Sequence, residues 1–214
     1  MTDGLVCVID DDPSVCRSVS RLLRSHNKRV ETYQSAGDFL EHRLPSSPAC
    51  LVLDLEMPGV SGLELQQALA ASRDTLPIVF LSGHASVSAS VDAMKKGAVD
   101  FLSKPVDDSK LMSAVDDALH RAQQAHKRRQ ALDQDRAAFK TLTEREQQVC
   151  VRVARGMLNK QIGYEFGTTE KTIKVQRGRV MQKLGAQSVA DVVRLVDRLA
   201  SAGDKLSDHL NVEN

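Results

Sequence analysis

Carboxylate, hydroxyl and ammonium groups stand at the ends of several short apolar runs in this chain. Three acids at residues 10–12 follow the first run, and Asp54, Ser82 and Lys104 end or follow later ones. Carboxylates held close together recruit a cation, and Mg²⁺ binds through one or two carboxylates together with phosphate oxygens. Mg²⁺ and the Lys104 ammonium would stabilise charge on a phosphoryl group that moves onto a carboxylate oxygen. Asp54 is the expected nucleophile for such an aspartyl phosphate.

A second group of residues suits contact with duplex DNA. The helix expected after Thr169 places Ile173, Val180 and Leu184 on one face and long donors on the other. In the major groove Lys reads guanine and an apolar group meets the thymine methyl, while flanking donors meet phosphates. We expect base contacts from Lys171, Lys174, Val175 and Gly178, and phosphate contacts from Lys160, Thr172, Gln176, Arg177 and Lys183.

Charge is divided unevenly along the 214 residues. Up to Leu119 the chain has 11 Lys and Arg against 17 Asp and Glu, and from His120 on it has 18 against 11. This asymmetry predicts an acidic domain followed by a basic one that meets a polyanion. Aromatic residues make up only 3% of the chain and Trp is absent, which argues against stacking on single-stranded nucleic acid.

Membrane and disulfide-rich protein classes are disfavoured. No apolar run approaches the roughly 20 residues of a membrane span, and the N-terminal sequence is acidic where a signal peptide is basic. The four cysteines are scattered, without a CxxC pair or histidines at ligand spacing, so neither a disulfide framework nor a zinc site is expected. We expect a cytoplasmic protein with no membrane partner.

The elements that must position the acidic groups alternate in the first 120 residues. Short apolar runs predict strands at 5–9, 30–33, 51–53, 78–81 and 99–102, and apolar residues three and four apart predict helices at 13–25, 35–42, 61–72, 86–96 and 107–119. This alternation predicts an α/β, five-stranded parallel doubly wound sheet. Functional groups collect at the carboxyl ends of such strands, where Asp54 and Ser82 stand. Alternatively, residues 10–12 merely cap the first helix and Asp54 begins a turn.

The basic half has no strand pattern. The fifth helix is expected to continue through a helical linker at 121–140, whose apolar stripe includes Leu132 and Phe139 but is interrupted by Arg129. Such a helix either is solvated and partly frayed or forms a weak two-chain seam. Residues 141–200 predict an all-α, four-helix domain with a helix-turn-helix, and residues 201–214 predict a mobile tail.

Capping residues mark the helix starts of this all-α domain. Thr143 and Glu146 form a capping-box pattern, because Thr stands at the cap and Glu at the third helical position. Asn159 is expected to cap the second helix, and Thr168 or Thr169 the third. The third helix is the one that carries the expected base contacts.

The motifs VIDD (8–11), DLEMPG (54–59), SG (82–83) and KP (104–105), in this order and spacing, resemble the receiver domain of two-component response regulators. The resemblance covers about residues 1–120 and implies that a sensor histidine kinase phosphorylates the chain. It implies a phosphoacceptor with Mg²⁺-dependent chemistry on itself only, not an enzyme, and a cis Lys-Pro bond. The implied site residues are the phosphoacceptor Asp54, the Mg²⁺ ligands Asp10, Asp11, Asp54 and Glu56 (through its carbonyl), the phosphoryl-stabilising Lys104 and Ser82, and the switch residues Ser82 and Phe101.

Two other functions fit part of this pattern. Haloacid-dehalogenase-like phosphatases also use a strand-end Asp with Mg²⁺ and a Lys, but they place a second Asp two residues after the nucleophile, where this chain has Glu56. They also need a cap or substrate pocket, for which about 120 residues leave little room. A DNA-binding regulator with a vestigial receiver would work without phosphorylation, but the complete acidic, hydroxyl and lysine set argues against it.

Segments 142–146, 159–162, 172–175 and 181–184 resemble the LuxR/NarL-type helix-turn-helix, over roughly residues 141–200. Together with the receiver motifs, the whole chain resembles a FixJ-like response regulator. This implies a transcription factor, often an activator, that pairs through the face at about residues 86–119 on phosphorylation. The homodimer would bind an inverted repeat in promoter DNA, with RNA polymerase as a further partner. Two positions depart from the pattern: Ser103 stands where an acid is common, and Gly178 is unusual on the reading face.

Overall fold

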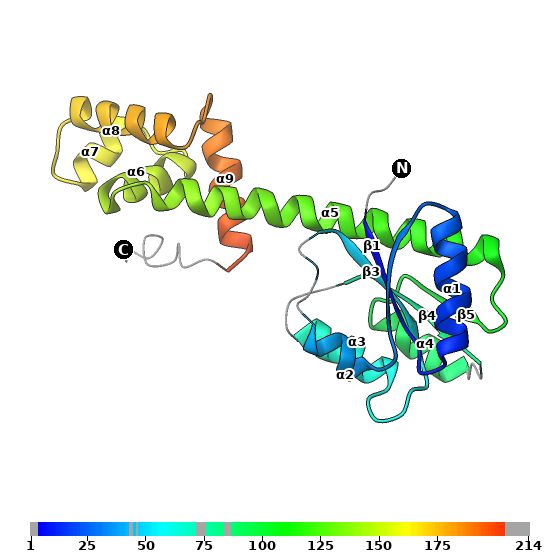
Figure 1. Cartoon of the computed structure of the whole chain (residues 1–214). Helices are drawn as coiled ribbons and strands as arrows, with labels where there is room; N and C mark the ends of the chain where they lie inside the picture. The colour runs from blue at the N-terminus through cyan, green and yellow to red at the C-terminus, as the bar shows by residue number, and fades with distance from the viewer. Residues whose placement is uncertain (1–3, 43–44, 46, 72–75, 84–86, 204–214) are drawn as a thin grey trace. The chain divides into compact units, whose positions relative to one another are not determined.

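The computed structural model describes residues 4–42, 45, 47–71, 76–83 and 87–203. The chain divides into two compact units, Met1–Lys127 and Arg128–Asn214. The first unit alternates strands with helices, and the described part of the second is helical (Figure 1). The tail predicted at 201–214 lies outside the described residues from position 204 on.

Five parallel strands form one sheet in the first unit, in the order β2-β1-β3-β4-β5. β1, β3 and β4 are buried along their whole length, which is why their sequences are continuous apolar runs. The predicted α/β, doubly wound parallel sheet is thereby confirmed. The strands are β1 (Leu5–Ile9), β2 (Arg29–Tyr33), β3 (Ala49–Asp54), β4 (Ile78–Ser82) and β5 (Asp100–Ser103).

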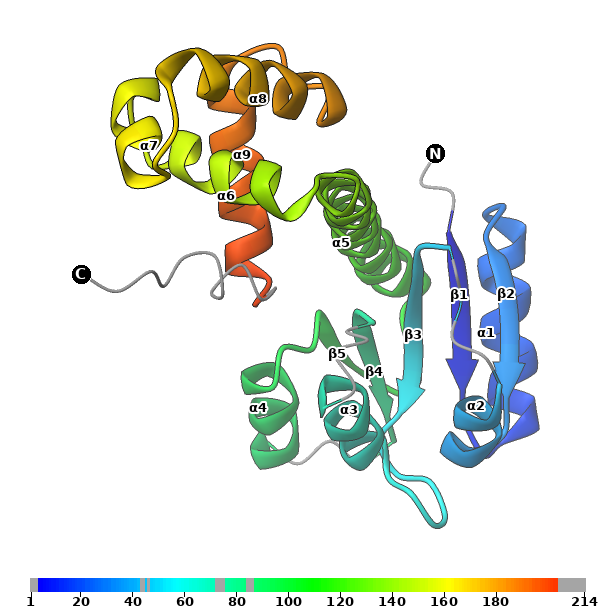
Figure 2. The ribbon, with the colours of Figure 1, turned by 90° about the vertical axis from the view of Figure 1, so that its left-hand side faces the viewer.

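Helices cover both faces of this sheet (Figure 2). Apolar residues of α1 and α5, such as Leu23 and Val115, pack on one face, and those of α2, α3 and α4, such as Phe39, Leu65 and Ala93, pack on the other. Two separate apolar cores therefore fix the sheet. The helices are α1 (Pro13–Ser25), α2 (Ala36–Glu41), α3 (Gly62–Ala71), α4 (Val87–Lys95) and α5 (Asp108–Lys140).

Strand β3 is longer than predicted because it pairs on both sides. The apolar run predicted a strand at 51–53, but pairing with β1 begins at Ala49, and pairing with β4 extends to Asp54, opposite Leu81. Asp54 is therefore held in the sheet and does not begin a turn. The helix ends predicted at positions 72 and 86 lie outside the described residues.

Helix α5 runs without interruption through the segment predicted as a helical linker. Its early apolar residues, including Leu111 and Val115, belong to a core of the sheet. Leu132 and Phe139, near its end, pack against the core of the second unit, whereas Ala125, which stands between Val115 and Leu132, is exposed. The apolar stripe is thus used within the two units, which favours a solvated helix over a two-chain seam.

The second unit packs four further helices around one core. Helix α8 contacts α6 and α7, and α6 also contacts α9. Val149, Ile162, Ile173 and Val192, one from each helix, are fully buried in this core. The helices are α6 (Glu144–Ala154), α7 (Asn159–Glu165), α8 (Glu170–Lys183) and α9 (Val189–Ser201).

The N-caps of α6 and α8 agree with the predictions, and the N-cap of α7 does not. The capping box at Thr143 is present, and Thr169 caps α8. The prediction for Asn159 is wrong, because Leu158 is the N-cap and Asn159 is the first residue of α7. Gln161 Oε1 accepts a hydrogen bond from the Leu158 N–H and so replaces the expected cap.

Candidate functional site

The carboxyl ends of neighbouring strands bring the predicted acidic residues together. Asp10 follows β1 and Asp54 ends β3, the strand beside it. One carboxylate oxygen from each of Asp10, Asp11 and Asp54 lies within 4.8 Å of the others. Asp10 and Asp54 are buried, whereas Asp11 is exposed. The cluster therefore has a buried floor and a side open to solvent.

Lys104, directly after β5, reaches across β4 into this cluster. Its Nζ lies 2.6 Å from Asp10 Oδ2 and 2.8 Å from Asp54 Oδ1. The Lys104–Pro105 peptide bond is cis, as the receiver resemblance implied. One ammonium thus neutralises part of the charge of three carboxylates and leaves an excess of negative charge.

Burial and charge set the protonation of the two central groups. Burial raises the pKa of Asp54, and Asp10 and Asp11 raise it further, although the Lys104 ammonium opposes them. Burial acts to lower the pKa of Lys104, but its hydrogen bonds to Asp10 and Asp54 outweigh this, and the pKa is raised. Lys104 therefore remains an ammonium beside Asp54 at neutral pH.

The three consecutive acids at 10–12 divide into two roles. Asp12 is the N-cap of α1, because its carboxylate accepts a hydrogen bond from the Ser14 N–H at 2.7 Å. The Asp12 N–H in turn donates to Asp10 Oδ1 at 3.0 Å and fixes that side chain. The capping alternative thus applies to Asp12 alone, while Asp10 and Asp11 belong to the carboxylate cluster.

Ser82 and Phe101, the predicted switch residues, lie on β4 and β5. Ser82 Oγ is buried and makes no hydrogen bond with any described residue. Phe101 is half-buried, and its ring centroid lies 6.1 Å from that of Phe80. A buried hydroxyl without a partner costs free energy, and Ser82 Oγ lies at the end of β4, the strand beside β3, which ends at Asp54.

Gly62, at the start of α3, is a supporting residue that the sequence patterns missed. A Cβ added there would lie 2.3 Å from the Asp54 carbonyl oxygen and 3.0 Å from the Phe80 ring. Only glycine therefore allows α3 to pack so closely against the backbone of the phosphoacceptor candidate. The side chain of Glu56, by contrast, is exposed.

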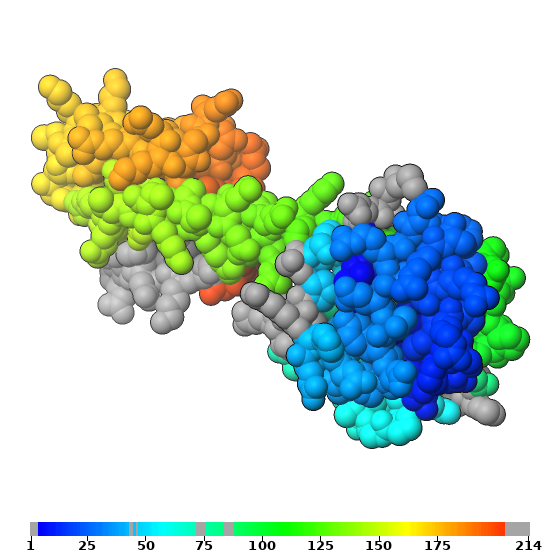
Figure 3. Space-filling model, in the orientation of Figure 1, coloured from blue at the N-terminus to red at the C-terminus, as the bar shows by residue number. Residues whose placement is uncertain are grey.

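In the second unit, α8 lies at the surface (Figure 3). Ile173 and Val180 point into the core, as predicted. Val175 is 52% exposed although it is apolar. The four predicted base-contact positions, Lys171, Lys174, Val175 and Gly178, are all exposed.

The five predicted phosphate-contact residues are placed differently from one another. Lys160 and Thr172 are exposed. Arg177 is half-buried and donates to Asn159 Oδ1 at 3.2 Å, and Gln176 is also half-buried. Lys183 Nζ donates to Glu146 Oε2 at 2.6 Å and to the Thr141 carbonyl at 3.3 Å. Three of the five are thus turned towards their own domain, and the exposed Arg179, which the helical projection did not select, lies beside the reading face.

Comparison with known families agrees with both halves of this geometry. Residues 6–116 match the family described as "response regulator receiver domain", and residues 140–196 match "bacterial regulatory proteins, luxR family". The chain belongs to the two-component response regulators. The output domain of this response regulator is of the LuxR type, a DNA-binding domain, and the protein is a transcription regulator.

Relatives of this response regulator are similar over nearly the whole chain. Nodulation protein W of Bradyrhizobium diazoefficiens is 41% identical over 92% of this chain and 87% of its own length. The transcriptional regulatory protein FixJ of the same organism is 38% identical over 95% of this chain and 99% of its own. A structure of the response regulator StyR has a TM-score of 0.81 and 45% identity, covering 92% of this chain and 99% of its own.

The residues of the carboxylate cluster fit a magnesium ion. Three carboxylates of different exposure offer hard oxygen ligands, and one side of the cluster is open to the water and phosphate oxygens that Mg²⁺ retains. The excess negative charge beside Lys104 favours a divalent cation.

Among the described residues, no helix is both long enough and apolar enough to cross a membrane.

Proposed function

We propose that Asp54 accepts a phosphoryl group from a sensor histidine kinase and that this modification switches the DNA-binding domain on. The observation that carries the proposal is the contact of the Lys104 ammonium with both Asp10 and Asp54 at the end of the sheet. An oxygen of Asp54 attacks the phosphorus of a phosphohistidine, an O–P bond forms, and the N–P bond to the imidazole breaks. Lys104 stabilises the negative charge on the phosphoryl oxygens as they arrive.

Asp10, Asp11 and Asp54, with the Glu56 carbonyl, would hold the magnesium ion. When bound there, Mg²⁺ supplies positive charge that lowers the repulsion between the carboxylates and a phosphoryl group. Asp12 keeps Asp10 in place by its backbone N–H. This division supports Asp54 as the acceptor, because Lys104 contacts both carboxylates but only Asp10 also accepts a backbone hydrogen bond, from the Asp12 N–H.

Ser82 and Phe101 transmit the change to the surface. The Ser82 hydroxyl gains its missing partner when it turns to a phosphoryl oxygen on Asp54, and Phe101 moves into the space that Ser82 leaves. The α4–β5–α5 face then pairs with that of a second copy. Val91 and Met94 on α4, which are 43% and 45% exposed, support this face as the dimer contact.

The dimer presents two recognition helices α8 to an inverted repeat in promoter DNA. One module of this size buries only about 600–1,000 Å² on DNA, so tight specific binding requires two half-sites. Lys171, Lys174, Val175 and Gly178 face the bases, and Lys160 and Thr172 meet phosphates. RNA polymerase is the partner through which the bound dimer activates transcription.

Lys183 and Arg177 receive a different role from the one that the sequence suggested. Lys183 already contacts Glu146 and the Thr141 carbonyl, so it fixes the end of α8 against the start of α6. Arg177 likewise joins α8 to α7 through Asn159. We assign Lys183 and Arg177 to positioning the recognition helix, whereas Gln176 is half-buried and has no contact with a described residue that gives it such a role.

The domain organisation follows from the packing of α5. We propose a receiver at residues 1–120, a helical segment at 121–140 and a DNA-binding domain at 141–200. The last turns of α5 are the part of the helical segment that packs on the DNA-binding domain, because Leu132 and Phe139 pack against its core and Asp135 pairs with Arg198 at 2.6 Å.

The test compares dimerisation and DNA affinity with and without acetyl phosphate and Mg²⁺. The DNA is a duplex recovered by in vitro selection. We expect the wild-type protein to dimerise and to bind at least tenfold more tightly once phosphorylated, whereas Asp54→Asn shows neither change. Asp38→Asn, an exposed acid of α2, is the matched control and behaves as wild type. Equal affinity of all proteins in both conditions would favour the vestigial-receiver alternative.

A further inference from the structure

Helix α1 carries a basic stripe in an otherwise acidic domain. Arg17, Arg21 and Arg24 stand at positions i, i+4 and i+7, which lie on one face of an α-helix, and all three are exposed. The helix itself contains no acidic residue. The phosphorylation site uses none of these arginines, so the stripe has no role in the function proposed above.

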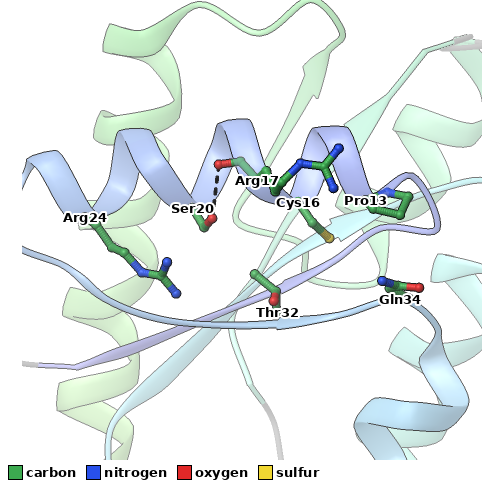
Figure 4. Close-up of a pocket in the computed structure, with 7 residues that line it drawn as sticks. All are labelled: Pro13, Cys16, Arg17, Ser20, Arg24, Thr32 and Gln34. Carbon is green, nitrogen blue, oxygen red and sulfur yellow. Dashed lines mark hydrogen bonds between the residues drawn. The ribbon is translucent and has the colours of Figure 1, made fainter.

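A groove lies beside this stripe, between α1 and the edge strand β2 (Figure 4). Its volume is about 250 Å³, and its walls include Arg17, Ser20 and Arg24 from α1, with Thr32 and Gln34 from β2 and the residue after it. Figure 4 shows Arg24 reaching towards β2 and Arg17 lying along the helix towards Pro13, so the two guanidinium groups stand towards opposite ends. No carboxylate lines the groove.

The guanidinium groups of this groove retain unused donors. Arg24 Nη2 donates to the Val30 carbonyl at 3.2 Å, which fixes the side chain but uses only one of its five N–H groups. The Arg17 guanidinium makes no hydrogen bond or ion pair with any described residue, and the Arg17 carbonyl accepts a bond from Ser20 Oγ at 3.1 Å. Thr32 and Gln34 add a hydroxyl and an amide on the facing wall. The groove therefore has a guanidinium towards each end, of which only Arg24 is held in place, with a hydroxyl and an amide on the facing wall at an open edge of the sheet.

We propose that this groove binds a compact multivalent anion of the phosphate or carboxylate class. A groove of about 250 Å³ with a guanidinium towards each end admits a small anion such as a pyrophosphate or a tricarboxylate. Arginine binds such groups through paired N–H donors. A long polyanion fits less well, because exposed Asp11 and Asp12 stand just before the same helix and repel it.

The test uses the full chain and isothermal titration calorimetry with inorganic pyrophosphate in magnesium-free buffer. We expect saturable 1:1 binding that weakens at least tenfold in the double variant Arg17→Gln/Arg24→Gln. Arg29→Gln is the matched control, because it removes an exposed arginine of β2 that does not line the groove, and its affinity stays within twofold of wild type. Arg17→Lys/Arg24→Lys keeps the charge and should retain most of the binding.

Backbone amide shifts in two-dimensional NMR locate the bound anion. We expect the shifts at Ser20, Thr32 and Gln34, and we expect Lys104→Gln to bind pyrophosphate as wild type does. Absence of binding at millimolar pyrophosphate would overturn the proposal. Equal binding by the double glutamine variant would overturn it, as would shifts confined to the surroundings of Asp54 and Lys104. None of these outcomes bears on phosphorylation of Asp54, because the two sites share no residue.

Discussion

Replacing Lys183 by glutamine removes an ammonium that lies 2.6 Å from Glu146 Oε2 and 3.3 Å from the Thr141 carbonyl. The Glu146 side chain is only 7% exposed, so the change leaves a nearly buried carboxylate without its cation. Hydrogen bonds to charged groups contribute about 1.5–3 kcal/mol. Because the Lys183 side chain is itself 36% exposed, solvent screening reduces this contribution, and we expect a loss of about 1–2 kcal/mol.

Hydrogen exchange in the full chain measures this loss where it occurs. We expect amides of α6 and α8 in Lys183→Gln to exchange about 5–30 times faster than in wild type, which corresponds to 1–2 kcal/mol of local stability. Lys140→Gln, which removes an exposed lysine of equal charge at the end of α5, is the control and should leave exchange unchanged.

The salt dependence of DNA binding separates positioning from phosphate contact. A lost phosphate contact lowers the slope of log affinity against log salt concentration by about 1. We expect Lys160→Gln to lower the slope in this way, while Lys183→Gln weakens binding with the slope unchanged. A Lys183→Gln protein with a slope lowered by about 1 and normal exchange would refute the positioning role.

Three further outcomes follow from the same contacts. Ser82→Ala should leave the unphosphorylated protein as stable in urea as wild type or up to about 1 kcal/mol more stable, because it removes a buried hydroxyl without a described partner. The same substitution should weaken dimerisation after acetyl phosphate treatment. A fragment 128–203 should be more stable to urea than a fragment 141–203 by roughly 2–4 kcal/mol, because it keeps Leu132 and Phe139 in the core. The pKa of Glu146 is lowered chiefly by Lys183, so the longer fragment should lose stability as pH falls below the usual glutamate value of about 4.3, and Glu146→Gln should flatten that dependence.

Each of these outcomes has a contrary result. A large destabilisation by Ser82→Ala in the unphosphorylated protein would mean that its hydroxyl is already satisfied. Equal stability of the two fragments would mean that the end of α5 does not belong to the C-terminal domain. An unchanged pH dependence in Glu146→Gln would remove that carboxylate from the acid response.

The carboxylate cluster was predictable because parallel strands share a direction. Once the apolar runs define strands, the residues that follow them must meet at one edge, which places Asp10, Asp54 and Lys104 together whatever the loops do. The separate role of Asp12 was not predictable, because three adjacent carboxylates look alike in sequence. Only the backbone at the start of α1 decides which of them caps the helix.

Contacts between side chains that are far apart in the sequence could not be predicted from the periodicity of the helices. The periodicity of α8 correctly placed Ile173 and Val180 in the core, but it treated Lys183 as free because Glu146 stands 37 positions earlier. Asn159 was interpreted as a cap because it stands at the start of a helix, whereas its side-chain oxygen Oδ1 accepts a hydrogen bond from Arg177. Gly62 was missed for the same reason, since its tight contact with the Asp54 carbonyl depends on tertiary packing.

Mass spectrometry after incubation with acetyl phosphate and Mg²⁺ tests the central assignment most directly. We predict that wild-type protein gains the mass of one phosphoryl group and that the gain is acid-labile and maps to Asp54. No gain should occur when magnesium is chelated before the incubation. Asp54→Asn should gain nothing, and Asp38→Asn should gain as much as wild type. An equal gain in Asp54→Asn, or none in wild type, would contradict the account.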